Sequence, residues 1–82
     1  MIKADEIKAL IEGGIPGARA EVVDEANDGE HFSATVTAPQ FAGMSRLQQH
    51  QAVYTALGEA IRSRIHALQL KTGAPPGAPD AS

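Results

Sequence analysis

Three histidines are the side chains of this 82-residue chain best suited to chemistry near neutral pH. His31 opens an alternating stretch, His50 lies in a long amphipathic stretch, and His66 stands just before Ala67-Leu68. No two of them have the short spacing of a zinc motif, so the sequence holds no self-contained metal site. Residue types alone favour ordinary roles: His66 at the core rim, His50 in packing, and His31 solvated beside an acidic turn.

Cysteine is absent. The chain therefore forms no disulfide, has no thiol nucleophile, and cannot hold an iron–sulfur cluster by thiolates of its own. Four carboxylates, Asp24, Glu25, Asp28 and Glu30, gather around one turn, where such groups usually improve solubility. There is no P-loop, Gly-x-Gly-x-x-Gly motif or nucleophile elbow. The sequence predicts that the protein is not an enzyme.

Charge and hydropathy limit the classes of partner that the protein can bind. The formal net charge of −3 argues against a broad electropositive surface for nucleic acid. No apolar run approaches the ~20 residues that cross a bilayer. The first ten residues, MIKADEIKAL, are charged and lack the apolar stretch of a signal peptide. We therefore expect a cytoplasmic protein with no membrane association.

The first half of the chain predicts a helix and a β-hairpin. Ile7, Leu10 and Ile11 form an apolar stripe in a helix over residues 3–12, with Gly13-Gly14 as a left-handed C-cap and Pro16 beyond it. Residues 18–25 and 31–38 alternate between apolar and polar side chains. The intervening ANDGE carries an Asn-Asp-Gly turn signal.

The second half predicts a helix and a third strand. Ser45 is a suitable N-cap for a helix that runs to about Arg64, with a kink or break near Gly58. Its apolar stripe comprises Leu47, His50, Val53, Tyr54, Leu57 and Ile61. Residues 65–71 predict a strand in which His66, Leu68 and Leu70 share one face. Any functional site is expected where residues 41–71 meet the hairpin.

The order of elements is α-β-β-α(α)-β. It predicts an α/β (α+β) fold with a three-stranded mixed sheet and helices on one face. The domain is expected to span residues 1–72. Residues 73–82, GAPPGAPDAS, offer no large apolar side chain and are predicted to form a disordered tail.

Four segments resemble the BolA-like protein family, and most closely its short bacterial IbaG-like members. The resemblance rests on His31-Phe32, on Phe41-Ala42-Gly43-Met44-Ser45-Arg46, on His50-Gln51-Ala52-Val53-Tyr54, and on Ile65-His66-Ala67-Leu68. It implies a fold related to the type II KH domain, although the Gly-x-x-Gly nucleic-acid loop of that domain is absent here.

The resemblance also implies a function and a site. BolA-like proteins pair with monothiol glutaredoxins and share a [2Fe–2S] cluster, with thiolates from the glutaredoxin and glutathione and a histidine from the BolA partner. The histidine of the Ile-His-Ala-Leu motif maps onto His66, which we expect to be a cluster ligand. His31 is the local candidate for a second ligand, although in longer-loop members that ligand lies upstream of this position.

Two departures bear on the alternatives. Gln49-His50-Gln51 stands where family members often have Arg-His-Arg, which weakens the case for a DNA-binding regulator. The usual Trp-containing C-terminal segment is also missing. Arg46, Arg64 and Lys71 are candidates to contact an acidic partner surface or glutathione, and with His50 they are the candidates for nucleic-acid contact. An interaction module without any metal is the third possibility.

Overall fold

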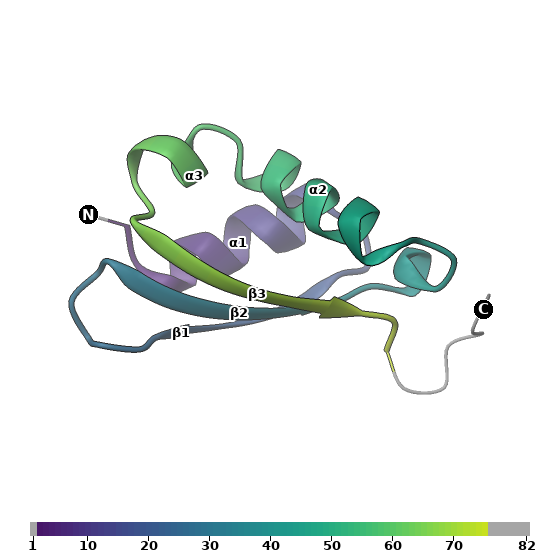
Figure 1. Ribbon diagram of the computed structural model, residues 1–82, viewed down its shortest axis with the longest axis horizontal. Helices are drawn as coiled ribbons and strands as arrows, with labels where there is room; N and C mark the ends of the chain where they lie inside the picture. The colour runs from purple at the N-terminus through teal and green to yellow at the C-terminus, as the bar shows by residue number, and fades with distance from the viewer. Residues whose placement is uncertain (1, 76–82) are drawn as a thin grey trace.

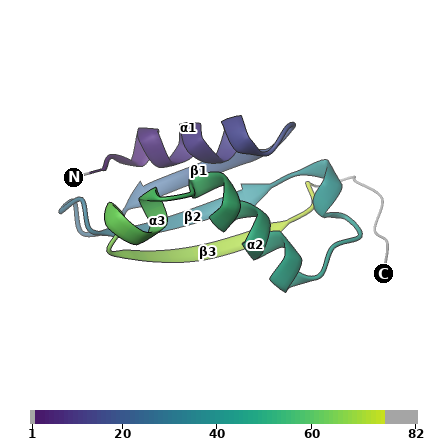
Figure 2. The ribbon, with the colours of Figure 1, turned by 90° about the horizontal axis from the view of Figure 1, so that it is seen from above.

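The computed structural model describes residues 2–75 and confirms the predicted α/β fold (Figure 1). The elements in chain order are α1 (Ala4–Gly14), β1 (Arg19–Asp24), β2 (His31–Thr37), the 3-10 helix η1 (Pro39–Phe41), α2 (Arg46–Leu57), α3 (Ala60–Ser63) and β3 (Ala67–Gly73). Both α1 and α2–α3 lie over the same face of the sheet, as Figure 2 shows.

The sheet has the order β1-β2-β3, so β2 is central. It pairs antiparallel with β1, where Ala20 lies opposite Val36, and parallel with β3, where Ala34 lies opposite Leu70. The hairpin turn is left-handed at Asn27 (φ 53°) and Gly29 (φ 72°), which confirms the turn signal. The connection from β2 to β3 runs through the helices, as a parallel pair requires.

The core lies between the sheet and the helices. The predicted alternation of β2 is confirmed: Phe32, Ala34 and Val36 are buried, and the residues between them are not. From the helices and the η1 turn come five further large buried side chains: Ile7, Ile11, Phe41, Val53 and Leu57. No polar or charged side chain is buried within residues 2–75. Any chemistry of this part of the chain must therefore take place at its surface.

The long helix breaks where the sequence indicates. Ser45 caps α2 in a capping box: its hydroxyl accepts from the Gln48 N–H at 3.1 Å, and the Gln48 side-chain oxygen accepts from the Ser45 N–H at 2.9 Å. Gly58 ends α2 at φ 57°. The prediction that the whole apolar stripe is buried was partly wrong, because Leu47 is 67% exposed and Tyr54 is 40% exposed. The three-turn helix α2 buries only a narrow face against the sheet. After the break, α3 runs in a different direction and buries Ala60.

The predicted cap of the first helix is also wrong. Gly13 and Gly14 are both helical, and neither has a positive φ. Ile15 is the C-cap in an extended conformation, and its N–H donates to the Ile11 carbonyl. The left-handed glycine is Gly17, at φ 81°. Gly14 is instead the point where α1 meets α2, because a Cβ there would lie 2.7 Å from the Ala56 Cβ.

The third strand begins and ends later than expected. His66 precedes β3 and is exposed, so the prediction that it shares a strand face with Leu68 and Leu70 is wrong. Ile65 is buried in its place and anchors the turn into the strand. Gly73, the first residue of the expected tail, belongs to β3, and its carbonyl accepts from the Ala38 N–H. Residues 76–82 of that tail lie outside the described residues.

Helices α1, α2 and α3, all within the described residues, are too short and too polar to span a bilayer.

Candidate functional site: a histidine pair at the hairpin-turn end of the sheet

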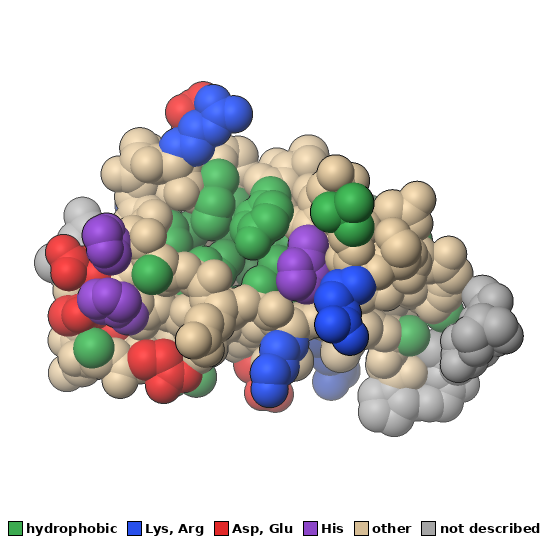
Figure 3. Space-filling view, in the orientation of Figure 1, with side chains coloured by type: hydrophobic (Ala, Val, Ile, Leu, Met, Phe, Trp, Pro, Cys, Tyr) green, Lys and Arg blue, Asp and Glu red, His purple; other side chains and the backbone are tan. Residues whose placement is uncertain are grey.

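The parallel pairing of β2 with β3 brings two histidines together. His31 lies opposite Ala67 in the register, and the Ala67 N–H donates to the Glu30 carbonyl at 2.9 Å. His66, one residue earlier, therefore stands beside His31. Their ring centroids are 5.5 Å apart, with the planes at 78° in an edge-to-face arrangement. Figure 3 shows two adjacent histidine side chains at the hairpin-turn end, among acidic groups.

The His31 ring is held by a carboxylate. Its Nδ1 lies 2.9 Å from Asp28 Oδ2. This hydrogen bond, together with the negative charge of Asp28, raises the pKa of His31 above its ordinary value. In return, the backbone N–H of Glu30 and the His31 ring lower the pKa of Asp28 to about 2. When the ring is neutral, Nδ1–H donates to Asp28 and leaves Nε2 with its lone pair available.

The turn that carries Asp28 is fixed by side-chain acceptors. Asp24 accepts from the N–H groups of Asp28 (3.1 Å) and Gly29 (2.8 Å). Asp28 Oδ1 accepts from the N–H groups of Glu30 (2.9 Å) and His31 (3.2 Å). Such bonds are the reason Asp is favoured in turns. These hydrogen bonds hold the Asp28 carboxylate in its position beside the His31 ring.

His66 is the less constrained member of the pair. It is exposed, and within residues 2–75 its ring takes part in no hydrogen bond or ion pair to another side chain. Beside it lies a surface hollow of about 450 Å³, lined by Gly29, Glu30 and the segment from Ile61 to His66. The pair thus combines one imidazole oriented by a carboxylate with one that opens toward a polar hollow.

The other predicted site residues are distributed over the surface. Arg64 lines the hollow beside His66, and its guanidinium pairs with Glu6 at 2.8 Å. Arg46 begins α2, and the His50 ring packs edge-to-face on Tyr54 at 6.5 Å. Lys71 lines a hollow formed with residues of β1 and β2. Of these four residues, only Arg64 lies near the histidine pair.

Sequence reasoning missed the part that carboxylates take in this site. Donor atoms of Asp28, Glu30 and His31 lie within 4.8 Å of one another, whereas the sequence suggested only a solubilising role for these acids. The signal was the spacing Asp-x-x-His across a tight turn, which brings the two side chains into contact. Clustering of acids at a turn is so common that this spacing alone does not stand out.

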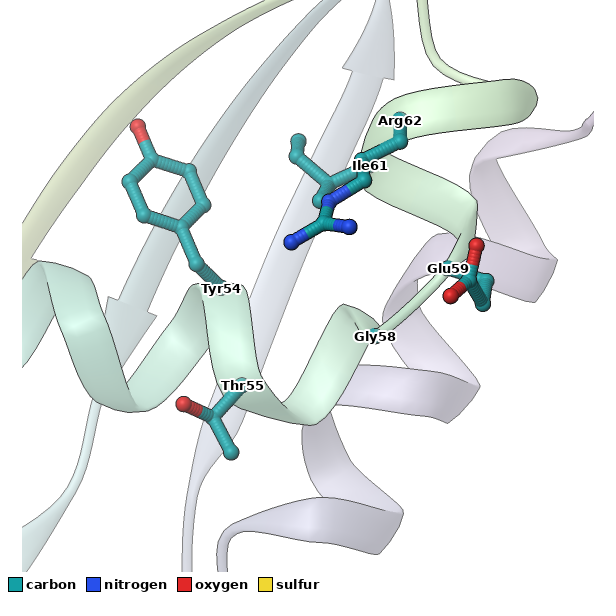
Figure 4. A pocket seen from close by; sticks show the side chains of 6 residues that line it. All are labelled: Tyr54, Thr55, Gly58, Glu59, Ile61 and Arg62. Atoms are coloured by element: carbon teal, nitrogen blue, oxygen red, sulfur yellow. The ribbon is translucent and has the colours of Figure 1, made fainter.

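Another surface hollow, shown in Figure 4, lies beside the break between α2 and α3. It measures about 470 Å³ and is lined by Tyr54, Thr55, Gly58, Glu59, Ile61 and Arg62. The hollow exists because Gly58 interrupts the helix and separates the side chains of its two parts. It contains no histidine and is separate from the pair at the hairpin turn.

The fold and the site together define a small α/β domain with an exposed histidine pair and no cysteine. The family model of BolA-like proteins matches residues 17–76, and the chain belongs to this family. The structure is similar to that of a BolA protein homologue from Coxiella burnetii, with a TM-score of 0.79 and 42% identity, covering 92% of this chain and 94% of that one.

Two curated proteins of Escherichia coli K12 are also similar. The acid stress protein IbaG is 41% identical over 54 residues, which cover 65% of this chain and 64% of IbaG. The DNA-binding transcriptional regulator BolA is 28% identical over 79 residues, which cover 88% of this chain and 75% of BolA. The resemblance to BolA-like proteins in the sequence is thereby confirmed.

Proposed function

We propose that this protein is a non-enzymatic adaptor that pairs with a monothiol glutaredoxin and helps to hold a [2Fe–2S] cluster in iron–sulfur trafficking or iron sensing. The observation that carries the proposal is the exposed pair of His31 and His66 at one end of the sheet. His66 is the proposed ligand and His31 the second candidate. The partner and its glutathione supply the thiolates that this chain lacks.

The donors present fit such a cluster. Both imidazoles are at the surface, where a second protein can approach them. Asp28 holds His31 Nδ1–H, the arrangement in which a carboxylate orients a histidine ligand and leaves Nε2 for a metal. When bound, the cluster supplies one-electron redox chemistry, and imidazole ligation in place of thiolate raises its potential.

The surroundings of His66 suit a partner contact. The hollow beside it is lined by two arginines, Arg62 and Arg64, and by Ser63. Guanidinium groups bind carboxylates through paired hydrogen bonds, and glutathione carries carboxylates. Arg64 would have to exchange its pairing with Glu6, an exposed ion pair of little energetic weight. The hollow is therefore the proposed contact for the partner-bound glutathione.

The experiment mixes the full chain with a monothiol glutaredoxin, glutathione, iron and sulfide under anaerobic conditions. Visible absorption and circular dichroism are compared with those of the glutaredoxin alone. A mixed cluster gives a new spectrum that reverts to the glutaredoxin spectrum with His66→Ala. His50→Ala is the matched control, since that histidine lies away from the pair. A spectrum unaffected by this chain, or indifferent to His66→Ala, contradicts the proposal.

A nucleic-acid-binding regulator is the alternative, and the similarity to the DNA-binding regulator BolA favours it. The position of Gln49, where family members often have arginine, argues against nucleic-acid binding. The Gln49 amide donates to the carbonyls of Phe41 (3.1 Å) and Met44 (3.0 Å) and accepts from the Thr72 hydroxyl at 2.7 Å. That side chain braces the fold and is not available to a phosphate. DNA affinity that falls steeply with rising salt would establish the alternative.

A further inference from the structure

We propose that the hairpin turn of the isolated chain binds a single divalent transition-metal ion through Asp28, Glu30 and His31. One donor atom from each of these residues lies within 4.8 Å of the other two. Imidazole with carboxylates is a donor set that zinc accepts, at metal–ligand distances of about 2.0–2.2 Å. This site needs no partner protein, and it does not depend on the proposed cluster function.

The geometry permits ligation with little rearrangement. His31 Nδ1 and Asp28 Oδ2 are 2.9 Å apart, so an ion between them replaces the proton that they share. In the neutral ring that proton moves to Nε2, so the ring remains neutral and Nδ1 has a lone pair for the ion. Glu30 lies between these two residues in the chain and is exposed, so its side chain can turn toward the ion without breaking core packing.

The turn is organised before any ion arrives. The Asp24 carboxylate accepts two backbone N–H groups and fixes the loop, and it is itself outside the donor set. The surrounding acids attract a cation, and Figure 3 shows acidic side chains gathered beside the histidines. Asp28 and His31 are already in contact and only the Glu30 side chain must turn, so the site loses less conformational entropy on binding than one that must be assembled.

The site differs from the cluster site in the ring nitrogen that it uses and in its neighbours. Here His31 binds through Nδ1, while in the proposed cluster complex Nδ1–H remains with Asp28. His66 lies against the His31 ring but outside the three-residue donor set. The two sites share His31 and Asp28, and one further residue distinguishes each of them: Glu30 belongs to the ion site alone and His66 to the cluster site alone.

Zinc chloride is titrated into the full isolated chain, and binding is followed by calorimetry and by amide NMR shifts. We expect one ion per chain, with shifts centred on residues 24–31. Glu30→Gln and His31→Ala should each weaken binding by about tenfold or more, the size of effect seen when metal-site residues are altered. Glu25→Gln, which removes a charge from the same hairpin, and His66→Ala should change it by less than about threefold.

Each result decides between specific ligation and simple charge attraction. Absence of binding at millimolar zinc overturns the proposal, and so does equal weakening by Glu25→Gln and Glu30→Gln. The Glu30→Gln variant is then mixed with the glutaredoxin, glutathione, iron and sulfide as above. A variant that loses zinc and keeps the mixed-cluster spectrum supports both sites. A chain that binds zinc as described and forms no mixed cluster supports this site and contradicts the cluster function.

Discussion

Gly14 of α1 and Ala56 of α2 touch so closely that the glycine cannot carry a side chain: a Cβ on Gly14 would lie 2.7 Å from the Ala56 Cβ and 3.1 Å from its Cα. Gly13, its neighbour, has nothing within 4 Å of the same position. Two adjacent helical glycines thus have different physical reasons to be there. Only Gly14 sets the distance between the two helices that cover the sheet.

Gly14→Ala should destabilise the protein by about 1–3 kcal/mol, because the methyl group overpacks the helix contact. Gly13→Ala should stabilise it by about 0.5–1 kcal/mol, because alanine loses less backbone entropy in a helix. Urea unfolding followed by circular dichroism measures both. The double variant Gly14→Ala with Ala56→Gly should recover part of the loss. Equal effects at the two glycines would contradict the assigned contact.

Asp28→Asn should lower the pKa of His31 toward its ordinary value. The carboxylate raises that pKa both through the hydrogen bond to Nδ1 and through its charge, and an amide retains only part of the first effect. The asparagine oxygen can still accept from the turn N–H groups, so the loop should persist. NMR titration of the His31 ring protons in the wild type and in the variant gives the two pKa values. An unchanged His31 pKa would show that the pair does not form in solution.

The same pair predicts how stability depends on pH. The lowered pKa of Asp28 contributes stability that is present above its ordinary 3.8 and is lost as pH falls through about 2. The raised pKa of His31 contributes stability that is present below its ordinary 6.5 and is lost as pH rises through the folded value. The difference between the wild type and Asp28→Asn should therefore be largest between pH 3.8 and 6.5. Because both groups are exposed, high salt should reduce it. Urea unfolding across this pH range tests the prediction, and a difference that is constant with pH would contradict it.

Ser45→Ala should cost about 1 kcal/mol of stability. It removes the hydroxyl that accepts from the Gln48 N–H and breaks the reciprocal capping box. Ser63→Ala is the matched control, because the exposed Ser63 hydroxyl donates to the Glu59 carbonyl and caps no N–H. Thermal unfolding of both variants is the measurement. An equal loss in both would mean that the capping box contributes nothing of its own.

The mixed cluster should be lost as the solution is acidified. Imidazole binds iron as the neutral base, so protonation competes with ligation. His31, whose pKa is raised, should release its metal at a higher pH than a histidine without a carboxylate partner. If both histidines ligate, Asp28→Asn should move the onset of cluster loss to lower pH in a visible-absorption titration. An onset of cluster loss that Asp28→Asn leaves unchanged would place His31 outside the cluster.

The local features of this fold could be predicted from the sequence because each depends on neighbouring residues. The alternation from Phe32 to Val36 defines which face of β2 is buried, since side chains alternate along any strand. Ser45 and Gly58 mark the start and the break of the long helix by their own backbone chemistry. The Asn-Asp-Gly signal placed the turn, and the absence of cysteine required that any thiolate come from another molecule.

Contacts between distant segments were decided by the tertiary structure. His31 and His66 meet because the parallel register puts His31 opposite Ala67, and no local period encodes that register. Gly14 has a packing role because α2 crosses it, whereas its sequence context suggested a cap. Leu47 and Tyr54 follow the helical period yet remain exposed, because only the placement of α2 over the sheet determines which part of its stripe is covered.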